Sequence, residues 1–188
     1  MIFEQIAVGR DNFAYLIADE KTREAIVVDP SFEPEKVLER AKQLNLDIKF
    51  LINTHSHHDH INGNDYILEN TDAKLIKNVD EIKSGNTVIK IIATPGHTED
   101  SICILVTNKL LTGDTLFVND VGFTRRERDA HTQFASLEKI IALGDDIEIY
   151  PGHDYGATPS STIGYEKAHS PCIIAIGKND FAKFLAEK

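Results

Sequence analysis

The chain has 188 residues and a mass of 21.0 kDa, and 41% of its residues are hydrophobic while 27% are charged. This balance excludes a disordered chain, which lacks the apolar content that offsets the entropy of ordering. The formal net charge of −10 disfavours non-specific binding to nucleic acid, because an acidic surface repels the phosphate backbone. On length alone we expect a single domain over residues 1–188.

The sequence shows no targeting or disulfide pattern. No apolar run approaches the roughly 18 residues that span a bilayer, and the first residues lack the basic and apolar segments of a signal peptide. The two cysteines, Cys103 and Cys172, are too few for a disulfide framework. We therefore expect a cytoplasmic protein that binds neither a membrane nor nucleic acid, and the sequence leaves its oligomeric state open.

Apolar periodicity predicts alternating strands and helices, which suits a layered α/β protein. Ser31 is the expected N-cap of the first helix, and Pro34 lies in its first turn. The expected elements in chain order are strands over 2–8, 13–18 and 24–28, a helix over 33–44, a strand over 48–52, a helix over 64–69, strands over 74–77 and 87–94, a hairpin over 101–107 and 110–112, a helix over 134–143, a strand over 147–150, and helices over 161–168 and 179–188.

The segment Thr54-His55-Ser56-His57-His58-Asp59-His60 directly follows a short predicted strand. Buried imidazole and carboxylate groups each need a polar partner, so this many cannot share an apolar core. The spacing lets His55 and His57 face one point while Asp59 and His60 turn to a second. Imidazole nitrogen and carboxylate oxygen are ligands for zinc, iron or manganese. A solvated polar loop is the alternative interpretation of this segment.

Three further ligand candidates, His97, Asp114 and His153, stand at the ends of predicted strands, each directly after a glycine. Taken singly, each would be an ordinary turn residue. The repeated pattern implies that several strand ends converge on one edge, where ligands gather in open α/β sheets. The combined set would serve two adjacent metal ions.

The order H-x-H-x-D-H, then His, Asp and His, resembles the metallo-β-lactamase superfamily. Segments 94–98, 112–117 and 150–154 resemble the branch around glyoxalase II (hydroxyacylglutathione hydrolase) and the persulfide dioxygenases, and the resemblance extends to about Tyr165. It implies an αββα sandwich, two mixed β-sheets flanked by helices. It also implies the ligand sets, which are His55, His57 and His97 for one ion, Asp59, His60 and His153 for the other, and Asp114 as the bridge between them.

The resemblance implies a metal-dependent hydrolase with two divalent metal ions, which would be zinc, iron or manganese. Two such ions lower the pKa of a shared water, so that a bridging hydroxide forms near neutral pH. Asp59 and Asp114 are the expected catalytic residues, and Asp59 would also orient the nucleophile. A small-molecule thioester suits the site, because a thiolate with a pKa of about 8.5 leaves without a strong general acid.

The main alternative is a persulfide dioxygenase that holds one Fe(II) ion. Its ligands would be His55, His97 and Asp114, a facial set that leaves positions open for oxygen and sulfur. A nuclease is disfavoured by the charge of −10, and β-lactam hydrolysis is disfavoured because no export signal is apparent. A non-catalytic role would require a metal-free site, which the intact ligand set argues against.

Two departures from the related families concern the substrate. Long glyoxalase II proteins carry a C-terminal helical extension that helps to hold glutathione, whereas this sequence ends at Lys188. Glutathione is therefore less firmly implied than thioester hydrolysis. Many short relatives have Gly-Arg-Thr-Asp after the bridging aspartate, and here Phe123 stands where they have arginine. Arg125 or Arg126 is expected to replace that arginine by binding an anionic end of the substrate.

The remaining polar candidates have ordinary interpretations. We expect His58 to be an exposed loop residue, since its neighbours take the ligand positions. His131 and His169 are expected at the surface, with lining of the substrate cleft as the alternative for His131. Cys103 lies in an apolar strand and is expected in the core.

Overall fold

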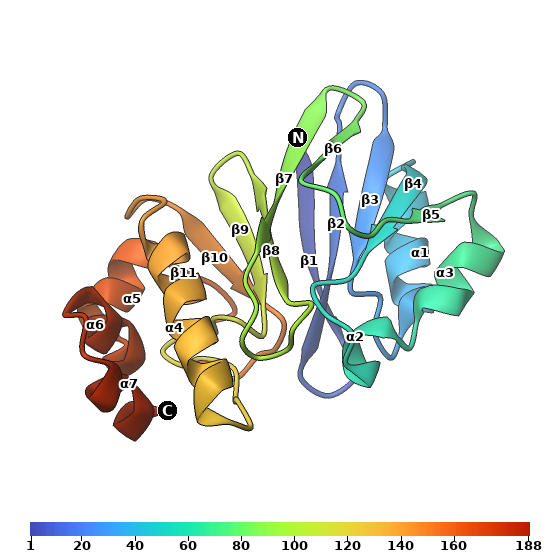
Figure 1. Ribbon diagram of the computed structural model, residues 1–188. Helices are drawn as coiled ribbons and strands as arrows, with labels where there is room; N and C mark the ends of the chain where they lie inside the picture. The colour runs from blue at the N-terminus through green and yellow to red at the C-terminus, as the bar shows by residue number, and fades with distance from the viewer. The chain divides into compact units, whose positions relative to one another are not determined.

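The computed structural model describes all of residues 1–188, in which runs of strands are separated by helices (Figure 1). Its strands are β1 (Ile2–Val8), β2 (Asn12–Ala18), β3 (Glu24–Val28), β4 (Asp47–Ile52), β5 (Lys74–Leu75), β6 (Glu81–Ser84), β7 (Thr87–Ala93), β8 (Ile102–Val106), β9 (Lys109–Gly113), β10 (Glu148–Pro151) and β11 (Ser161–Thr162). Its helices are α1 (Pro34–Gln43), α2 (His58–Ile61), α3 (Asn64–Asn70), α4 (Glu127–Ile141), α5 (Ile163–His169), α6 (Pro171–Gly177) and α7 (Phe181–Glu187).

The chain divides into two compact units, residues 1–91 and residues 92–188. The expectation of one domain over 1–188 stays a prediction. In the first unit, five strands form a mixed sheet in the order β1-β2-β3-β4-β5. β1, β2 and β3 pair antiparallel, whereas β3, β4 and β5 pair parallel. β3 and β4 therefore end at the same edge, where the backbone N–H of Asp29 donates to the carbonyl of Ile52 at 3.1 Å.

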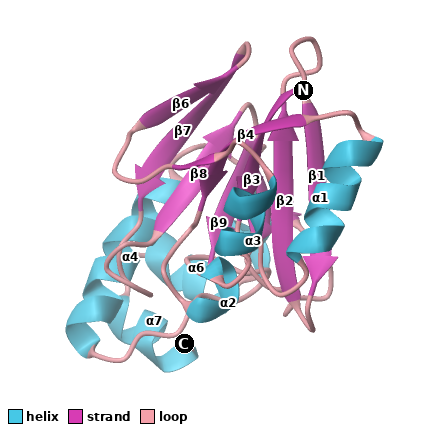
Figure 2. Ribbon diagram, turned by 90° about the vertical axis from the view of Figure 1, so that its right-hand side faces the viewer, coloured by secondary structure: helices cyan, strands magenta, loops and turns pink.

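Helix α1 covers one face of the five-stranded sheet. It buries Val37, Leu38 and Ala41 in a cluster that also contains Leu16 of β2 and Val27 of β3. Figure 2 shows α1 lying across β1 and β2, which it also contacts. Each buried Val or Leu side chain stabilises the fold by about 1.5–3 kcal/mol. The helix and sheet of this unit therefore hold the strand ends in place.

The second sheet is also mixed, with the strand order β11-β10-β9-β8-β7-β6. β8 and β9 form the expected antiparallel hairpin, and β9 pairs parallel with β10. Because β9 and β10 run in the same direction, their C-terminal ends meet at one edge. The N–H of Gly152 donates to the carbonyl of Gly113 at 2.9 Å there. Asp114 and His153, the residues that directly follow these glycines, consequently start from neighbouring points of the backbone.

The core of the second unit joins strands β8, β9 and β10 to helices α4, α6 and α7. Phe134 and Leu137 of α4, Ile173 of α6 and Phe184 of α7 are buried in it, together with Cys103 of β8. The expected core position of Cys103 is thus confirmed, and burial raises the pKa of its thiol to about 12. This thiol therefore stays protonated and unreactive at neutral pH.

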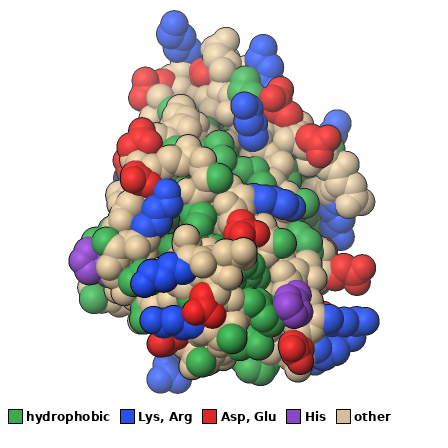
Figure 3. All heavy atoms as spheres, turned by 60° about the vertical axis from the view of Figure 1, so that its left-hand side comes forward, with side chains coloured by type: hydrophobic (Ala, Val, Ile, Leu, Met, Phe, Trp, Pro, Cys, Tyr) green, Lys and Arg blue, Asp and Glu red, His purple; other side chains and the backbone are tan.

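Sheets and helices together confirm the α/β class expected from the sequence. None of the helices combines the length and the apolar character that a membrane span requires. On the face drawn in Figure 3, Lys and Arg side chains are interspersed with Asp and Glu side chains, so this face carries no large patch of a single charge.

The structure corrects the predicted start of the helix over 134–143. Helix α4 begins at Glu127, seven residues earlier than expected. The first turns of this helix are rich in charged residues and lack the apolar periodicity that predicts a helix. Asp129 in the first turn accepts hydrogen bonds from Arg126, at 2.8 Å from Nε and 3.2 Å from an NH group. An acidic side chain near a helix N-terminus also interacts favourably with the helix dipole.

Other local predictions were wrong for physical reasons. Ser31 does not cap α1, which has Glu33 at its N-cap position and no side-chain cap; instead the Ser31 hydroxyl donates to the carbonyl of Asp59. The strand over 81–84 was missed because Ile82 is its only apolar residue, so the sequence shows no apolar alternation there. The helix over 171–177 was missed because an almost wholly apolar run has no periodicity to read.

Candidate metal centre

The loop after β4 brings His55 and His57 together. His55 Nε2 lies 3.0 Å from His57 Nδ1, and the two rings meet edge to face with their centroids 4.6 Å apart. Thr54 Oγ1 lies 3.2 Å from the other nitrogen of His55. Two ring nitrogens at this separation either share a proton or face a common cation. The predicted pairing of these two histidines is therefore present in the structure.

Asp59 and His60 form a second pair on helix α2, the short helix that directly follows. His60 Nε2 lies 3.7 Å from Asp59 Oδ2, and the His60 ring is buried. His60 Nδ1 lies 2.9 Å from Asp29 Oδ2. Since a carboxylate oxygen only accepts hydrogen bonds, Nδ1 carries a proton, and Nε2 faces Asp59. Asn12 supports Asp59 by donating to its carbonyl at 3.1 Å.

In the second unit, Asp114 lies between two histidines. Its Oδ2 atom is 3.5 Å from His97 Nε2 and 3.4 Å from His153 Nε2. Asp114 is only 8% exposed and follows Gly113, which has a φ of +48° that favours glycine. His153 stacks on Tyr155, with the ring centroids 4.7 Å apart. Carboxylate and imidazole groups of three separate strand ends thus converge within this unit.

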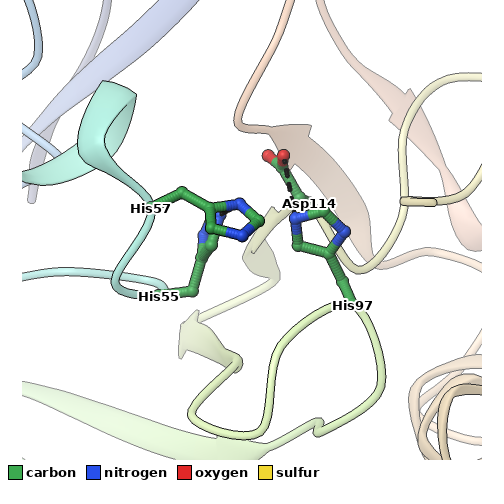
Figure 4. A group of neighbouring side chains, drawn as sticks. All are labelled: His55, His57, His97 and Asp114. Carbon is green, nitrogen blue, oxygen red and sulfur yellow. Dashed lines mark hydrogen bonds and ion pairs between the residues drawn. The ribbon is translucent and has the colours of Figure 1, made fainter. Parts of the chain in front are cut away.

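His97 is oriented through its other ring nitrogen. Nδ1 lies 2.8 Å from the carbonyl oxygen of Phe123, which can only accept, so Nδ1 donates. A hydroxyl pair, Thr94 Oγ1 and Thr115 Oγ1 at 3.1 Å, links the backbone before His97 to the backbone after Asp114. His97 therefore directs Nε2 towards Asp114, which Figure 4 marks with a dashed line.

The donor chemistry fits divalent metal ions. Imidazoles whose Nδ1–H is held by an oxygen acceptor, next to carboxylate oxygens, are usual ligands of zinc and of related transition metals. Figure 4 draws four of these side chains, with His55 and His57 on the loop after β4. The first unit thus offers two pairs of donors, His55 with His57 and Asp59 with His60, and the second unit offers His97, Asp114 and His153.

The two arginines proposed to bind the substrate differ in their surroundings. Arg126 is engaged by Asp129 through two hydrogen bonds. Arg125 is exposed and has no hydrogen bond or ion pair within the described residues 1–188. It lies two residues after Phe123, whose carbonyl holds His97. Of the two, Arg125 keeps its guanidinium available for an external anion.

The remaining histidines are exposed as expected, although His58 is the first residue of helix α2 and not a loop residue. His58, His131 and His169 are exposed. His131 stacks on Phe181 with the centroids 3.6 Å apart, so its ring joins α4 to α7. His169 stacks on Tyr165 at the end of α5.

Two buried polar residues near the ligands were missed by the sequence analysis. Asp29 bonds to His60, and it follows strand β3 in the same strand-end position as the ligand candidates, so that pattern could have identified it. Gln133 lies inside α4 and donates to the carbonyl of Gly122 at 2.8 Å. No local pattern in the sequence distinguishes Gln133 from an ordinary helix residue.

Comparisons with known proteins agree with this chemistry. The family model of the metallo-beta-lactamase superfamily matches residues 7–90. The probable polyketide biosynthesis zinc-dependent hydrolase PksB of Bacillus subtilis is 30% identical, over 96% of this chain and 89% of its own. The hydroxyacylglutathione hydrolase of a Polaromonas species is 38% identical, over 82% of this chain and 67% of its own.

Similarity to persulfide dioxygenases is of the same order. The human mitochondrial persulfide dioxygenase ETHE1 is 31% identical, over 92% of this chain and 75% of its own. The crystal structure of ETHE1 from Myxococcus xanthus matches with a TM-score of 0.88 and 32% identity, and the match covers 99% of this chain and 89% of that one.

Proposed function

Because the chain belongs to the metallo-β-lactamase superfamily, we propose that it is a metal-dependent hydrolase that cleaves thioesters. Divalent metal is supported by the two groups of histidine and aspartate side chains and by the zinc-dependent hydrolase among the relatives. We propose two ions, zinc or a mixture with iron or manganese. One group would be His55, His57 and His97, the other would be Asp59, His60 and His153, and Asp114 would serve both.

The proposal depends above all on Asp114, whose Oδ2 atom has a histidine nitrogen on either side, at 3.5 and 3.4 Å. A carboxylate in this position can serve two ions at once. The first unit contributes two separate ligand pairs, His55 with His57 and Asp59 with His60. Two pairs and a central carboxylate match the donors that two ions need.

When bound, such ions supply a hydroxide nucleophile near neutral pH and polarise the carbonyl of the substrate. The side chains of the protein then position the reactants. Asp59 orients the attacking water, and Asn12 fixes the backbone of Asp59 through its carbonyl. His97 and His60 keep their protons on Nδ1, bonded to Phe123 and Asp29, so that both rings present Nε2.

A small-molecule thioester is the proposed substrate class, and neither nucleic acid nor a membrane is a proposed partner. A thiolate leaves without a strong general acid, and no further acid is needed near the ligands. The similarity to a hydroxyacylglutathione hydrolase at 38% identity supports this class. Arg125 is the proposed contact for an anionic group of the substrate, since its guanidinium is exposed and unengaged.

A persulfide dioxygenase is the second candidate, favoured by the similarity to ETHE1 proteins. In that case His55, His97 and Asp114 would hold a single Fe(II) ion. The two candidates differ in metal content and in co-substrate, because only the dioxygenase consumes oxygen.

The first experiment is to measure metal identity and stoichiometry on protein purified anaerobically without chelator. About two ions per chain would support the hydrolase. One iron per chain, followed by oxygen uptake with a low-molecular-weight persulfide, would replace it with the dioxygenase. Absence of bound metal even after reconstitution would refute both.

The second experiment follows thiol release from a panel of S-acyl thioesters by the metal-loaded protein. Asp59→Ala and His97→Ala are expected to lose more than about 100-fold in rate, since each removes a ligand. His58→Ala is the matched control, because His58 lies in the same segment but is exposed. Intact thioesters throughout the panel, or full activity in both ligand variants, would refute the proposal.

A further inference from the structure

Helix α4 presents two buried polar side chains to the loops around His97. Gln133 and Ser136 are 0% and 1% exposed, and a buried polar group is costly unless it is hydrogen-bonded. Ser136 Oγ donates to the carbonyl of Pro95 at 2.7 Å, and Gln133 Nε2 donates to the carbonyl of Gly122 at 2.8 Å. Pro95 lies two residues before His97. Gly122 directly precedes Phe123, whose carbonyl contacts the His97 ring.

The fit between α4 and the turn that carries His97 is close. Gly96 has a φ of +150°, and a Cβ atom at this position would lie 2.4 Å from the Cβ of Gln133. Gly122 is similarly confined, because a Cβ there would lie 1.8 Å from the carbonyl oxygen of Asp114 and 2.9 Å from His97 Nδ1. A shift of either loop away from α4 would break a hydrogen bond, that of Ser136 to Pro95 or that of Gln133 to Gly122.

Gln133 is itself fixed at both ends of its amide. Its Nε2 atom donates to Gly122, while its Oε1 atom accepts a hydrogen bond from the Lys188 amine. Lys188 Nζ also donates to the carbonyl of Gly122, at 2.5 Å. The amide orientation is therefore determined by its partners, with the donor facing the loop.

We infer that Gln133 is a positioning residue for His97, acting through the backbone of Gly122 and Phe123. Gln133 holds the carbonyl of Gly122, and the carbonyl of the next residue holds His97 Nδ1 at 2.8 Å. The two carbonyls are consecutive along the chain, so fixing the direction of the first restrains the second. The ring of His97 then keeps its proton on Nδ1 and directs Nε2 towards Asp114. This inference rests on the proposed function only in taking His97 as a metal ligand.

The test measures metal affinity, by titrating metal-stripped protein with Zn²⁺ against a chromophoric chelator. Gln133→Met keeps the size of the side chain without its donor, and Gln133→Glu keeps its shape but places an acceptor against the Gly122 carbonyl. Both are expected to weaken Zn²⁺ binding about tenfold, the lower end of the effect of residues that orient metal ligands. The visible spectrum of the Co²⁺-loaded variants is expected to shift, because the ligand geometry changes.

Three comparisons make the result decisive. Glu138→Met is the matched control, since Glu138 is exposed on the same helix and should leave Zn²⁺ affinity unchanged. The thermal midpoint of the metal-free proteins separates positioning from folding, because a purely structural Gln133 would lower that midpoint and leave the affinity of the folded protein intact. Wild-type affinity and an unchanged Co²⁺ spectrum in both Gln133 variants would overturn the inference.

His97→Ala distinguishes failure of this inference from failure of the proposed function. If His97→Ala weakens Zn²⁺ binding and the Gln133 variants do not, only the positioning role is refuted. If His97→Ala binds Zn²⁺ as the wild type does, His97 is not a ligand, and both the metal centre and the inference are refuted.

Discussion

Asp29 places both of its carboxylate oxygens against the segment that carries the histidine cluster. Oδ1 accepts from the backbone N–H of Thr54 at 2.8 Å, and Oδ2 accepts from the Thr54 hydroxyl at 2.5 Å and from His60 Nδ1 at 2.9 Å. Asp29 is 1% exposed, so water does not compete for these bonds. A carboxylate that holds a ligating histidine fixes its orientation and raises its basicity. Asp29 thereby couples the end of β3 to the proposed ligand pair on α2, Asp59 and His60.

The change Asp29→Asn tests this coupling. Asparagine keeps the shape but can point an NH₂ group at His60 Nδ1–H, which leaves one of the two donors unsatisfied. We expect metal affinity at the Asp59–His60 pair to fall about 10- to 100-fold, so that metal stoichiometry after dialysis drops. Elemental analysis measures this, with the exposed Asp65→Asn as the control. Unchanged stoichiometry would show that Asp29 serves stability alone.

Arg125 and Arg126 provide a second test at the scale of single residues. Arg126 is occupied by Asp129, whereas Arg125 is free. Arg125→Ala is expected to raise KM for thioesters with a carboxylate group about tenfold, the effect of losing one charged contact of about 1.4 kcal/mol, with little change in kcat. Arg126→Ala should leave KM unchanged. Equal KM values for anionic and neutral thioesters in Arg125→Ala and wild type would contradict a binding role.

At the scale of elements, parallel neighbouring strands explain why the candidates meet. β3 and β4 end together, which brings Asp29 to the segment that carries His55, and β9 and β10 end together, which brings Asp114 to His153.

Turns at the opposite ends of the strands are fixed by polar contacts of their own. Asp19, in the turn between β2 and β3, accepts from the N–H groups of Lys21 and Thr22 at 2.9 and 2.8 Å.

Asp19 also accepts from the N–H of Asn86 in the turn between β6 and β7, at 3.1 Å. These hydrogen bonds lower the pKa of Asp19 from 3.8 to about 2, and the bond from the N–H of Thr22 makes the largest contribution. A lowered pKa in the folded state means that the carboxylate stabilises the fold above about pH 4. This stabilisation is lost as the pH falls through about 2.

We therefore expect Asp19→Asn to lower the thermal midpoint at neutral pH, and the difference from wild type to shrink between pH 4 and pH 2. Circular dichroism melts across this range measure it, with the exposed Asp72→Asn as the control. A difference between wild type and Asp19→Asn that is constant with pH would contradict the assignment.

At the scale of the whole molecule, the fold class expected from the resemblance is confirmed. Two mixed sheets with flanking helices, and a match of 0.88 in TM-score over 99% of the chain, show the metallo-β-lactamase fold. Each of the two compact units holds its own group of ligand candidates in place by backbone and side-chain bonds. The candidate ligands are therefore held in place within each unit.

If the proposed metal ions are bound to the folded protein, removing them should lower its stability. A ligand that binds only the folded state stabilises it by about 2.7 kcal/mol when its free concentration is 100 times its Kd. We expect a chelator to lower the thermal midpoint by several degrees and added Zn²⁺ to restore it. The exposed-residue variant His58→Ala should keep the full effect, and His97→Ala should lose most of it. A midpoint that is insensitive to chelator and to added metal would contradict a resident metal.

The α/β class, most of the strands and the seven candidate ligands could be predicted from the amino-acid sequence. Those features depend on neighbours in the chain, namely apolar alternation, short turns and the spacing of His and Asp residues. Their roles stay predictions that the experiments above test. Sequence periodicity failed where it was weak, in the charged first turns of α4 and in the apolar run of α6.

The tertiary structure alone decided how the candidates are held. His60 finds its partner Asp29 31 residues away, and His97 finds the carbonyl of Phe123 26 residues away. Gln133 reaches the backbone of Gly122 from inside a helix. Hydrogen bonds of this kind form only when strand ends and helices meet in space, because a carbonyl or a carboxylate has no directional signature in the sequence. The candidate ligands follow local sequence patterns, whereas the groups that orient their side chains lie far away in the sequence.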